Sequence, residues 1–169
     1  MKIDADGFSF DFTNAIDAFV FDEKDTSKPN YHGAPMKGVD IIAELDEAYV
    51  FVEMKNYDDP DSFKDALSSE DEEAKRANFT WLKDYLKYKY RDTYIYRHAE
   101  GKTDKPIHYI CLLTFDNALN SRMQHSLKRE LPVGKASRRW IREIANSCQV
   151  VNVNSWNRNF PKWPVTTTC

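Results

Sequence analysis

Two short apolar segments decide the fold of this chain, Gly38–Glu44 (GVDIIAE) and Tyr49–Asn56 (YVFVEMKN). Both contain the β-branched and aromatic residues that strands favour, and a polar turn at Asp46 and Glu47 separates them. The pattern therefore predicts a β-hairpin. The turn is not the favoured Asn-Gly or Asp-Gly, but a four-residue loop over 45–48 would give the same strand pairing.

The register of this hairpin brings three charged residues together. Facing residues of an antiparallel pair are counted outward from the turn, so Asp40 is predicted to face Glu53. Side chains alternate between the two faces of a sheet, which places Lys55 on the same face as both carboxylates and leaves the other face almost wholly apolar. A shift by one residue would separate Asp40 from Glu53.

Two interpretations of this charged face are open. An exposed face would carry ordinary cross-strand ion pairs, each worth only a fraction of a kcal/mol. Ile42 and Phe51 lie on the same face and indicate partial burial, and a buried carboxylate needs a partner or a metal ion. Mg²⁺ binds one or two protein carboxylates and keeps several waters, so the face has the composition of a Mg²⁺-dependent phosphodiesterase site.

The arrangement of Asp40 followed by Glu53-Met54-Lys55 resembles the core motif of the PD-(D/E)XK nuclease superfamily. Its members share the restriction-endonuclease-like fold, in which a helix precedes a hairpin with Asp and Glu-x-Lys, and a helix and further strands follow. The resemblance covers roughly the first two thirds of the chain. Val39 stands in place of the proline of the family name, a departure that many members share.

The resemblance implies a role for each residue of the motif. Asp40 and Glu53 would hold a Mg²⁺ or Mn²⁺ ion, and the backbone carbonyl of Met54 would be a further ligand. Lys55 would position or help deprotonate the attacking water and offset charge on the pentacovalent phosphate, and its electrostatic role is the one we favour.

Four residues near the motif are weaker candidates. The superfamily often adds an acid from its first helix, for which Asp17 and Asp22 are available. Glu44 shares the charged face of the hairpin but sits near the turn, where exposure is the simpler expectation. His32, in the loop before the hairpin, is placed to touch a substrate, although a lone histidine is more often structural.

The rest of the chain predicts a mixed α/β domain with a central mixed sheet and flanking helices, in agreement with a restriction-endonuclease-like core. Hydrophobic periodicity and turn signals predict a helix from about Phe10 to Phe21, a helix from Ser62 or Ser69 to near Arg91, a buried central strand Ile107–Thr114, helices around 119–131 and 136–145, and a last strand Gln149–Val153. We expect 169 residues to form one domain, with a basic helical part from about residue 117.

Charge is distributed unevenly around a net value of −3. Residues 1–60 carry fourteen acidic residues against five Lys or Arg, whereas residues 121–169 carry nine basic residues against two acidic ones. A nuclease needs an acidic part with metal-type carboxylates and a basic part that suits phosphate groups. An equally simple interpretation is that the two parts attract each other across the fold.

Two groups near the C-terminus are candidates for contact with nucleic acid. Four basic residues share one side of the predicted helix 136–145: Lys135, Arg138, Arg139 and Arg142. That side would bind a phosphate backbone, although a solvated helix face has the same pattern. Three aromatic residues alternate with basic ones further on: Trp156, Phe160 and Trp163. They would stack on single-stranded bases, or pack onto the core as aromatic residues near a terminus more often do.

The leading hypothesis is a divalent-metal-dependent nuclease that acts on DNA rather than RNA, and as a homodimer if it cuts both strands. The main rival keeps the fold without the reaction, as a binding or scaffold protein, and a third is an unrelated α/β protein whose hairpin matches by accident. The chain has neither a transmembrane-length apolar run nor an apolar signal core, so we expect a cytoplasmic protein without a membrane partner and with reduced cysteines.

Overall fold

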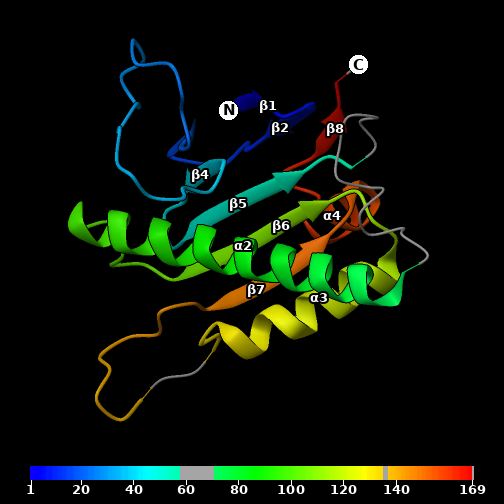
Figure 1. Cartoon of the computed structure of the whole chain (residues 1–169). Coiled ribbons are helices and arrows are strands. Elements are labelled where there is room, and N and C mark those ends of the chain that lie inside the picture. The colour runs from blue at the N-terminus through cyan, green and yellow to red at the C-terminus, as the bar shows by residue number, and fades with distance from the viewer. Residues whose placement is uncertain (58–70, 135–136, 169) are drawn as a thin grey trace.

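The computed structural model of the chain describes residues 1–57, 71–134 and 137–168. Its centre is a five-stranded mixed sheet in the order β3-β4-β5-β6-β7 (Figure 1). Its strands are β3 (Asp17–Val20), β4 (Ile41–Glu44), β5 (Tyr49–Lys55), β6 (Ile107–Leu113) and β7 (Ser147–Val151). Strands β3, β4 and β5 are antiparallel neighbours, whereas β6 runs parallel to β5 and β7 parallel to β6. The predicted α/β class and mixed sheet are confirmed.

Different layers cover the two faces of this sheet. Helices α2 (Glu72–Ala99) and α3 (Asn117–Glu130) lie on one face, as Figure 1 shows. The other face is covered by a small sheet and a short helix: β1 (Lys2–Ala5), β2 (Phe8–Asp11), β8 (Val165–Thr167) and α4 (Val153–Asn159). Each face has its own hydrophobic core. The hairpin strands are therefore buried on both sides, which explains why both of their faces contain large apolar residues.

The hairpin has the predicted register. Ile41 faces Val52, so Asp40 and Glu53 occupy the next facing positions away from the turn. Both apolar residues of the charged face, Ile42 and Phe51, are fully buried. The charged face is therefore an internal face and not an exposed polar one.

Four further elements agree with the sequence-based expectations in kind and differ at their ends. Strand β6 lies between β5 and β7, as a buried central strand should, and α3 occupies the helix expected around 119–131. Helix α2 begins after Asp71, whose side chain accepts the N–H of Glu73, and it continues past Arg91 to Ala99. The proposed caps Ser62 and Ser69 lie outside the described residues. The last predicted strand is β7, which begins at Ser147 and ends before 152.

The helix predicted from about Phe10 to Phe21 is wrong, because this segment forms β2, a turn and β3. Phe8, Phe10 and Phe12 are all fully buried, and their spacing of two residues is the period of a strand. Ile16, which the helical stripe requires inside, is 53% exposed. The apolar residues of two short strands and the turn between them thus happen to recur at intervals typical of a helix.

The helix predicted around 136–145 is also wrong. Between α3 and β7 the described residues form turns that extend away from the sheet beyond the end of α3 (Figure 1). Trp140 is 40% exposed and Ile141 is 93% exposed, whereas Ala145 is fully buried, so the residues of the expected apolar stripe do not share one covered face. A parallel bridge between Val133 and Ala145 closes this excursion. From residue 117 onward the chain therefore contains the helices α3 and α4 together with these turns and the strands β7 and β8.

The basic residues of this region therefore do not form the side of a helix. Arg138 and Arg139 are exposed on turns, and Arg142 Nη1 donates to the carbonyl of Thr103 at 2.6 Å. Lys135 lies outside the described residues.

The aromatic residues near the C-terminus pack onto the core, which was the simpler of the two interpretations. Trp156 is fully buried, with its ring centroid 5.3 Å from that of Phe10. Its Nε1 donates to the carbonyl of Trp163 at 2.6 Å, and Phe160 stacks on Trp163. These contacts attach α4 and the following turn to the small sheet.

Buried contacts fasten the segment before β4 to α2. The N–H of Val39 donates to Thr93 Oγ1 at 2.9 Å, and that hydroxyl donates to the carbonyl of Lys89 at 2.7 Å. One residue earlier, Gly38 lies so close to Phe21 that a Cβ would come within 2.9 Å of the ring. The entry to β4 is thereby held directly under the helix.

We predict that Thr93→Val destabilises the protein, because it keeps the side-chain volume but leaves the buried N–H of Val39 without its acceptor. The free energy of unfolding should fall by about 1–3 kcal/mol, as measured by urea denaturation. Thr80→Val, at an exposed position of the same helix, is the matched control and should change it by less than about 0.5 kcal/mol. Equal effects of the two substitutions would contradict this role of Thr93.

Candidate functional site

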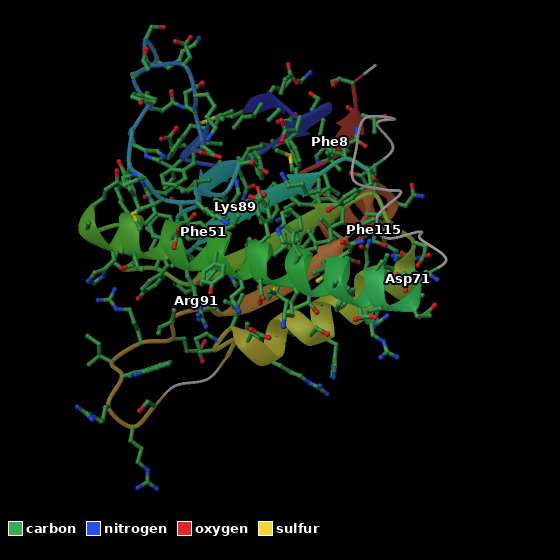
Figure 2. The ribbon with its side chains drawn as sticks, viewed as in Figure 1. Phe8, Phe51, Asp71, Lys89, Arg91 and Phe115 are labelled. Carbon is green, nitrogen blue, oxygen red and sulfur yellow. The ribbon has the colours of Figure 1, made fainter. Side chains whose placement is uncertain are left out.

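The charged face of the hairpin lies against α2, which supplies a cation to it. Lys89 lies on the side of α2 that faces the sheet, beside the hairpin strands (Figure 2). Its Nζ is 3.3 Å from Asp22 Oδ2, 3.7 Å from Asp40 Oδ1 and 3.4 Å from Glu53 Oε2. We call these three acids the carboxylate cluster. The Lys89 side chain is 5% exposed, so one buried ammonium group contacts all three members.

The motif residues meet as the register predicted. Glu53 has no exposed surface, and neither of its carboxylate oxygens has a hydrogen-bond partner among the described residues. Lys55 Nζ is 3.7 Å from Glu53 Oε1. Asp40 Oδ2 accepts the backbone N–H of Met54 at 2.6 Å, which places the backbone of the predicted third ligand beside Asp40. The two carboxylates therefore share one side of the sheet.

Three lysine ammonium groups contact the ring of Tyr85, a residue of α2 at the edge of the cluster. Its ring centroid lies 5.0 Å from Lys55 Nζ and 5.4 Å from the Nζ atoms of both Lys37 and Lys89. Such cation–π contacts keep ammonium groups close together without a carboxylate between them. Lys37 is exposed and the Lys55 side chain is 31% exposed. These two lysines can therefore reach an anion that approaches from solvent.

Burial governs the protonation of the site. It raises the pKa of Asp40, and burial together with the neighbouring Asp40 charge raises the pKa of Glu53 well above its ordinary value. Burial alone would lower the pKa of Lys55 and of Lys89, but the charge of Glu53 and the other nearby acids raises both pKa values instead. Both lysines are thus protonated near neutral pH. Lys55 suits the electrostatic role and not that of a general base.

Of the acids predicted as weaker candidates, Asp22 joins the carboxylate cluster and Asp17 does not. Asp17 is exposed at the start of β3, where it pairs in the ladder with Glu44. Glu44 accepts hydrogen bonds from Lys105 at 2.8 Å and from Lys102 at 3.1 Å, which direct it away from the cluster. Since 10–21 contains strands, neither Asp17 nor Asp22 comes from a helix.

The acids of the hairpin are neutralised by lysines that precede the basic C-terminal part. Among the described residues, Asp40, Glu44 and Glu53 pair with four lysines: Lys55, Lys89, Lys102 and Lys105. The attraction between two oppositely charged halves, which the charge distribution had suggested, is therefore not what holds the hairpin in place.

Neither Lys89 nor Tyr85 was predicted from the sequence to belong to the site. A signal for them exists, because Lys89 follows Leu82 by seven positions and Tyr85 by four, within the apolar stripe of α2. A lysine in such a stripe is expected to be buried, and a buried lysine needs an acid.

Asp40 and Glu53 offer oxygen ligands of the kind that a divalent cation prefers. Asp40 and Glu53 approach one point, marked by Lys89 Nζ, and the Glu53 oxygens have no competing hydrogen bond. Within residues 1–57, 71–134 and 137–168, no three His, Cys, Asp or Glu residues are arranged as a metal-ligand set. Mg²⁺ is commonly held by one or two carboxylates and water, so the donor set fits such an ion, which would compete with Lys89.

Comparisons with models of protein families, with curated proteins and with solved structures give no significant match. Across the described ranges, no helix combines the length and the apolar character needed to cross a membrane.

We predict that Lys89→Met costs about 3–5 kcal/mol of unfolding free energy at pH 8, because it leaves buried carboxylates without their shared cation. The pKa values of Asp40 and Glu53 are already raised, so in the variant both groups take up protons as the pH falls, and the unpaired charge disappears. The deficit relative to the unmutated protein should accordingly be smaller at pH 5 than at pH 8. Urea denaturation at the two pH values measures it.

The matched control is Lys87→Met, which removes a lysine of the same helix whose partners are Asp84 and Glu130 at 2.7 Å each. Because Asp84 and Glu130 are 40% and 31% exposed and remain hydrated without the lysine, its deficit should be smaller, about 1 kcal/mol. A Lys89 deficit that does not exceed the Lys87 deficit would show that the cluster does not depend on its cation.

Proposed function

We propose that this protein is a divalent-metal-dependent nuclease of restriction-endonuclease-like fold, which hydrolyses phosphodiester bonds in DNA rather than RNA. The observation that carries the proposal is the convergence of Asp40, Glu53 and Lys55 on one buried face, where both carboxylates lie within 3.7 Å of a single cation position. Two carboxylates beside a lysine are the groups that metal-assisted phosphodiester hydrolysis uses.

The order of the elements supports the proposal. The motif hairpin is followed by helix α2 and then by strand β6, parallel to β5, and in the restriction-endonuclease-like fold a helix and further strands likewise follow the hairpin. The chain departs from that fold in one respect, because residues 1–57 form strands and turns where a first helix is expected. Asp22 reaches the cluster from the segment after β3 instead of from a helix.

Each side chain of the site has a distinct task in this proposal. A Mg²⁺ or Mn²⁺ ion would, when bound, polarise the phosphate and activate a water. Asp40 and Glu53 would hold it, with the backbone at Met54 beside them. Lys55, protonated and partly exposed, would bind a phosphate oxygen and stabilise the charge that develops on it. Lys37 would bind a neighbouring phosphate and position the strand without reading its sequence.

The test is cleavage of one sequence supplied as single-stranded DNA, double-stranded DNA and RNA, with Mg²⁺ or Mn²⁺. We expect DNA to be cut, and Asp40→Asn and Lys55→Ala to lower the rate by at least about 100-fold each, because each removes a group that stabilises the transition state. Circular dichroism checks that the variants are folded.

Glu47→Gln is the matched control, since Glu47 is an exposed acid in the turn of the same hairpin. Its cleavage rate should equal that of the unmutated protein. Undiminished cleavage by folded Lys55→Ala protein would refute the mechanism.

The position of Lys89 among the carboxylates supports a second candidate function, that of a non-catalytic binding or scaffold protein. Its ammonium group already neutralises the point where the carboxylates converge, so the site is stable without a metal ion. This is the arrangement expected of a nuclease-fold protein that binds or organises a partner without cutting it. The two functions differ in one property, which is whether a divalent cation displaces Lys89.

Calorimetric titration with Mn²⁺ separates them. For a nuclease we expect Mn²⁺ binding that Asp40→Asn abolishes and that Lys89→Met strengthens roughly tenfold, equivalent to about 1.4 kcal/mol, because the competing charge is gone. Lys87→Met should bind Mn²⁺ like the unmutated protein. Folded protein that binds no Mn²⁺, with or without Lys89, would favour the scaffold function.

A further inference from the structure

Three aromatic residues form a stripe along α2 beside the carboxylate cluster. Trp81, Tyr85 and Tyr88 follow one another at spacings of four and three residues, which places them on one side of the helix. Trp81 stacks on Tyr85, with ring centroids 5.3 Å apart and an angle of 19° between the ring planes. We call these three residues the aromatic stripe. It extends over roughly 10 Å along the axis of α2.

The two ends of the aromatic stripe are exposed to solvent. Trp81 is 51% exposed and Tyr88 is 46% exposed, the two largest exposed fractions among the aromatic side chains that the structure describes. Tyr85, between them, is partly exposed. A half-exposed ring gains free energy when another flat apolar surface covers it. The stripe is therefore a surface on which flat groups can stack.

Lysine side chains lie beside the same rings. Lys37 Nζ is 5.4 Å from the ring centroid of Tyr85 and 6.0 Å from that of Tyr88, so it contacts two members of the stripe. Lys55 Nζ is 5.0 Å from the Tyr85 centroid. The backbone N–H of Lys37 donates to Asp92 Oδ2 at 2.9 Å, which holds this segment against α2. The stripe thus combines exposed rings with cations held next to them.

Asp84, which directly precedes Tyr85, is neutralised by two lysines. Its Oδ1 atom is 2.7 Å from Lys87 Nζ and 3.8 Å from Lys83 Nζ, and both lysines also pair with Glu130 of α3. This carboxylate therefore presents little net negative charge to a polyanion that approaches the stripe.

We propose that the aromatic stripe binds single-stranded nucleic acid, with bases stacked on Trp81 and Tyr88 and phosphates held by Lys37 and Lys55. Every base has a flat face that stacks on an aromatic ring, and lysines beside the rings neutralise the backbone. In a duplex these faces are covered by neighbouring base pairs, so the stripe could not contact them. Its length corresponds to about three nucleotides of a stacked strand.

The stripe adjoins the candidate cleavage site through Tyr85. The Tyr85 ring contacts both Lys55 and Lys89, and the ammonium groups of these lysines lie 3.7 Å and 3.4 Å from the Glu53 carboxylate. A strand on the stripe would therefore pass its phosphates along Lys37 and Lys55 toward the cluster. The inference that this strand is the substrate rests on the proposed nuclease function and narrows it to single-stranded DNA, whereas binding by itself does not.

Ring packing distinguishes the stripe from the pocket of about 370 Å³ between β3 and the end of α2, which His32 and Arg97 line. The ring centroid of Phe21 there lies 5.0 Å from that of His32 and 5.2 Å from that of Tyr96. Tyr90, in the cavity of about 600 Å³ between α2 and α3, is only 1% exposed. A base has less access to these rings than to the stripe.

The test is fluorescence anisotropy of the full chain, in buffer with EDTA, with three labelled probes of about 12 nucleotides. They are a thymidine strand, a duplex that contains it, and an abasic strand that keeps the phosphates without the bases. The thymidine strand should bind at least about tenfold more tightly than the other two. Trp81→Ala and Tyr88→Ala, both at exposed helix positions, should each weaken its binding about tenfold and leave abasic-strand binding unchanged.

Trp140→Ala is the matched control, because Trp140 is a 40% exposed tryptophan in the turns that extend away from the sheet beyond α3 (Figure 1). Its affinity for the thymidine strand should equal that of the unmutated protein. Lys37→Ala should lower the slope of log affinity against log salt concentration by about 0.7, since one phosphate contact is lost, whereas Trp81→Ala should keep the slope.

Equal binding of the thymidine and abasic strands would overturn the proposal, as would unchanged affinity in folded Trp81→Ala and Tyr88→Ala proteins or an equal loss in Trp140→Ala. Polyglutamate that competes as well as the thymidine strand would also overturn it and assign the stripe to an acidic protein segment. Because EDTA excludes metal and cleavage, strand binding by a protein that cuts no DNA would remove only the nuclease proposal. Cleavage of DNA without binding by the stripe would remove only this one.

Discussion

The fold requires that the buried carboxylates of the hairpin, Asp40 and Glu53, be neutralised by an opposite charge. Asp40 and Glu53 face the interior because the hairpin is covered by α2, and a buried ionised carboxylate needs an opposite charge. Lys89 meets this need from the helix itself, 3.7 Å from Asp40 and 3.4 Å from Glu53. The position of α2 and the register of the hairpin are therefore coupled, because a change in either would leave charges unpaired.

The same coupling defines what the site can do. Lys89 is almost wholly buried and directed at the cluster, whereas Lys55 is partly exposed at its edge beside Tyr85 and Lys37. The inner lysine balances the carboxylates, and the outer lysines remain available to an anion from solvent. Catalysis and simple binding use the outer lysines alike, and they differ in whether the inner cation gives way to a metal ion. The chemistry of the site is thus decided by a competition between Lys89 and a divalent cation for the same carboxylates.

Sequence reasoning succeeded where the periodicity was local and the burial two-sided. The hairpin register followed from its turn, and β6 and α3 followed from a continuous apolar run and a regular stripe. It failed over 10–21 because the strand alternation of Phe8, Phe10 and Phe12 is followed by a turn and a second strand. The turn spaces the apolar residues of the two strands by chance as they would be spaced on one helix. It failed over 136–145 because Trp140 and Ile141 stay exposed while Ala145 is buried, and no pattern within the segment reveals this difference.

The hairpin, the common face of Asp40, Glu53 and Lys55 and the mixed α/β class could be predicted from the sequence, because each depends on residues close together in the chain. Other features needed the three-dimensional arrangement: α2 covers that face, Asp22 belongs to the carboxylate cluster and Lys89 pairs with it, and His32 and Arg97 line one pocket. These groups come from separate elements, whose contacts arise from packing on a shared sheet. The packing decides which charged residues pair inside the protein, and composition alone does not show which pairs form.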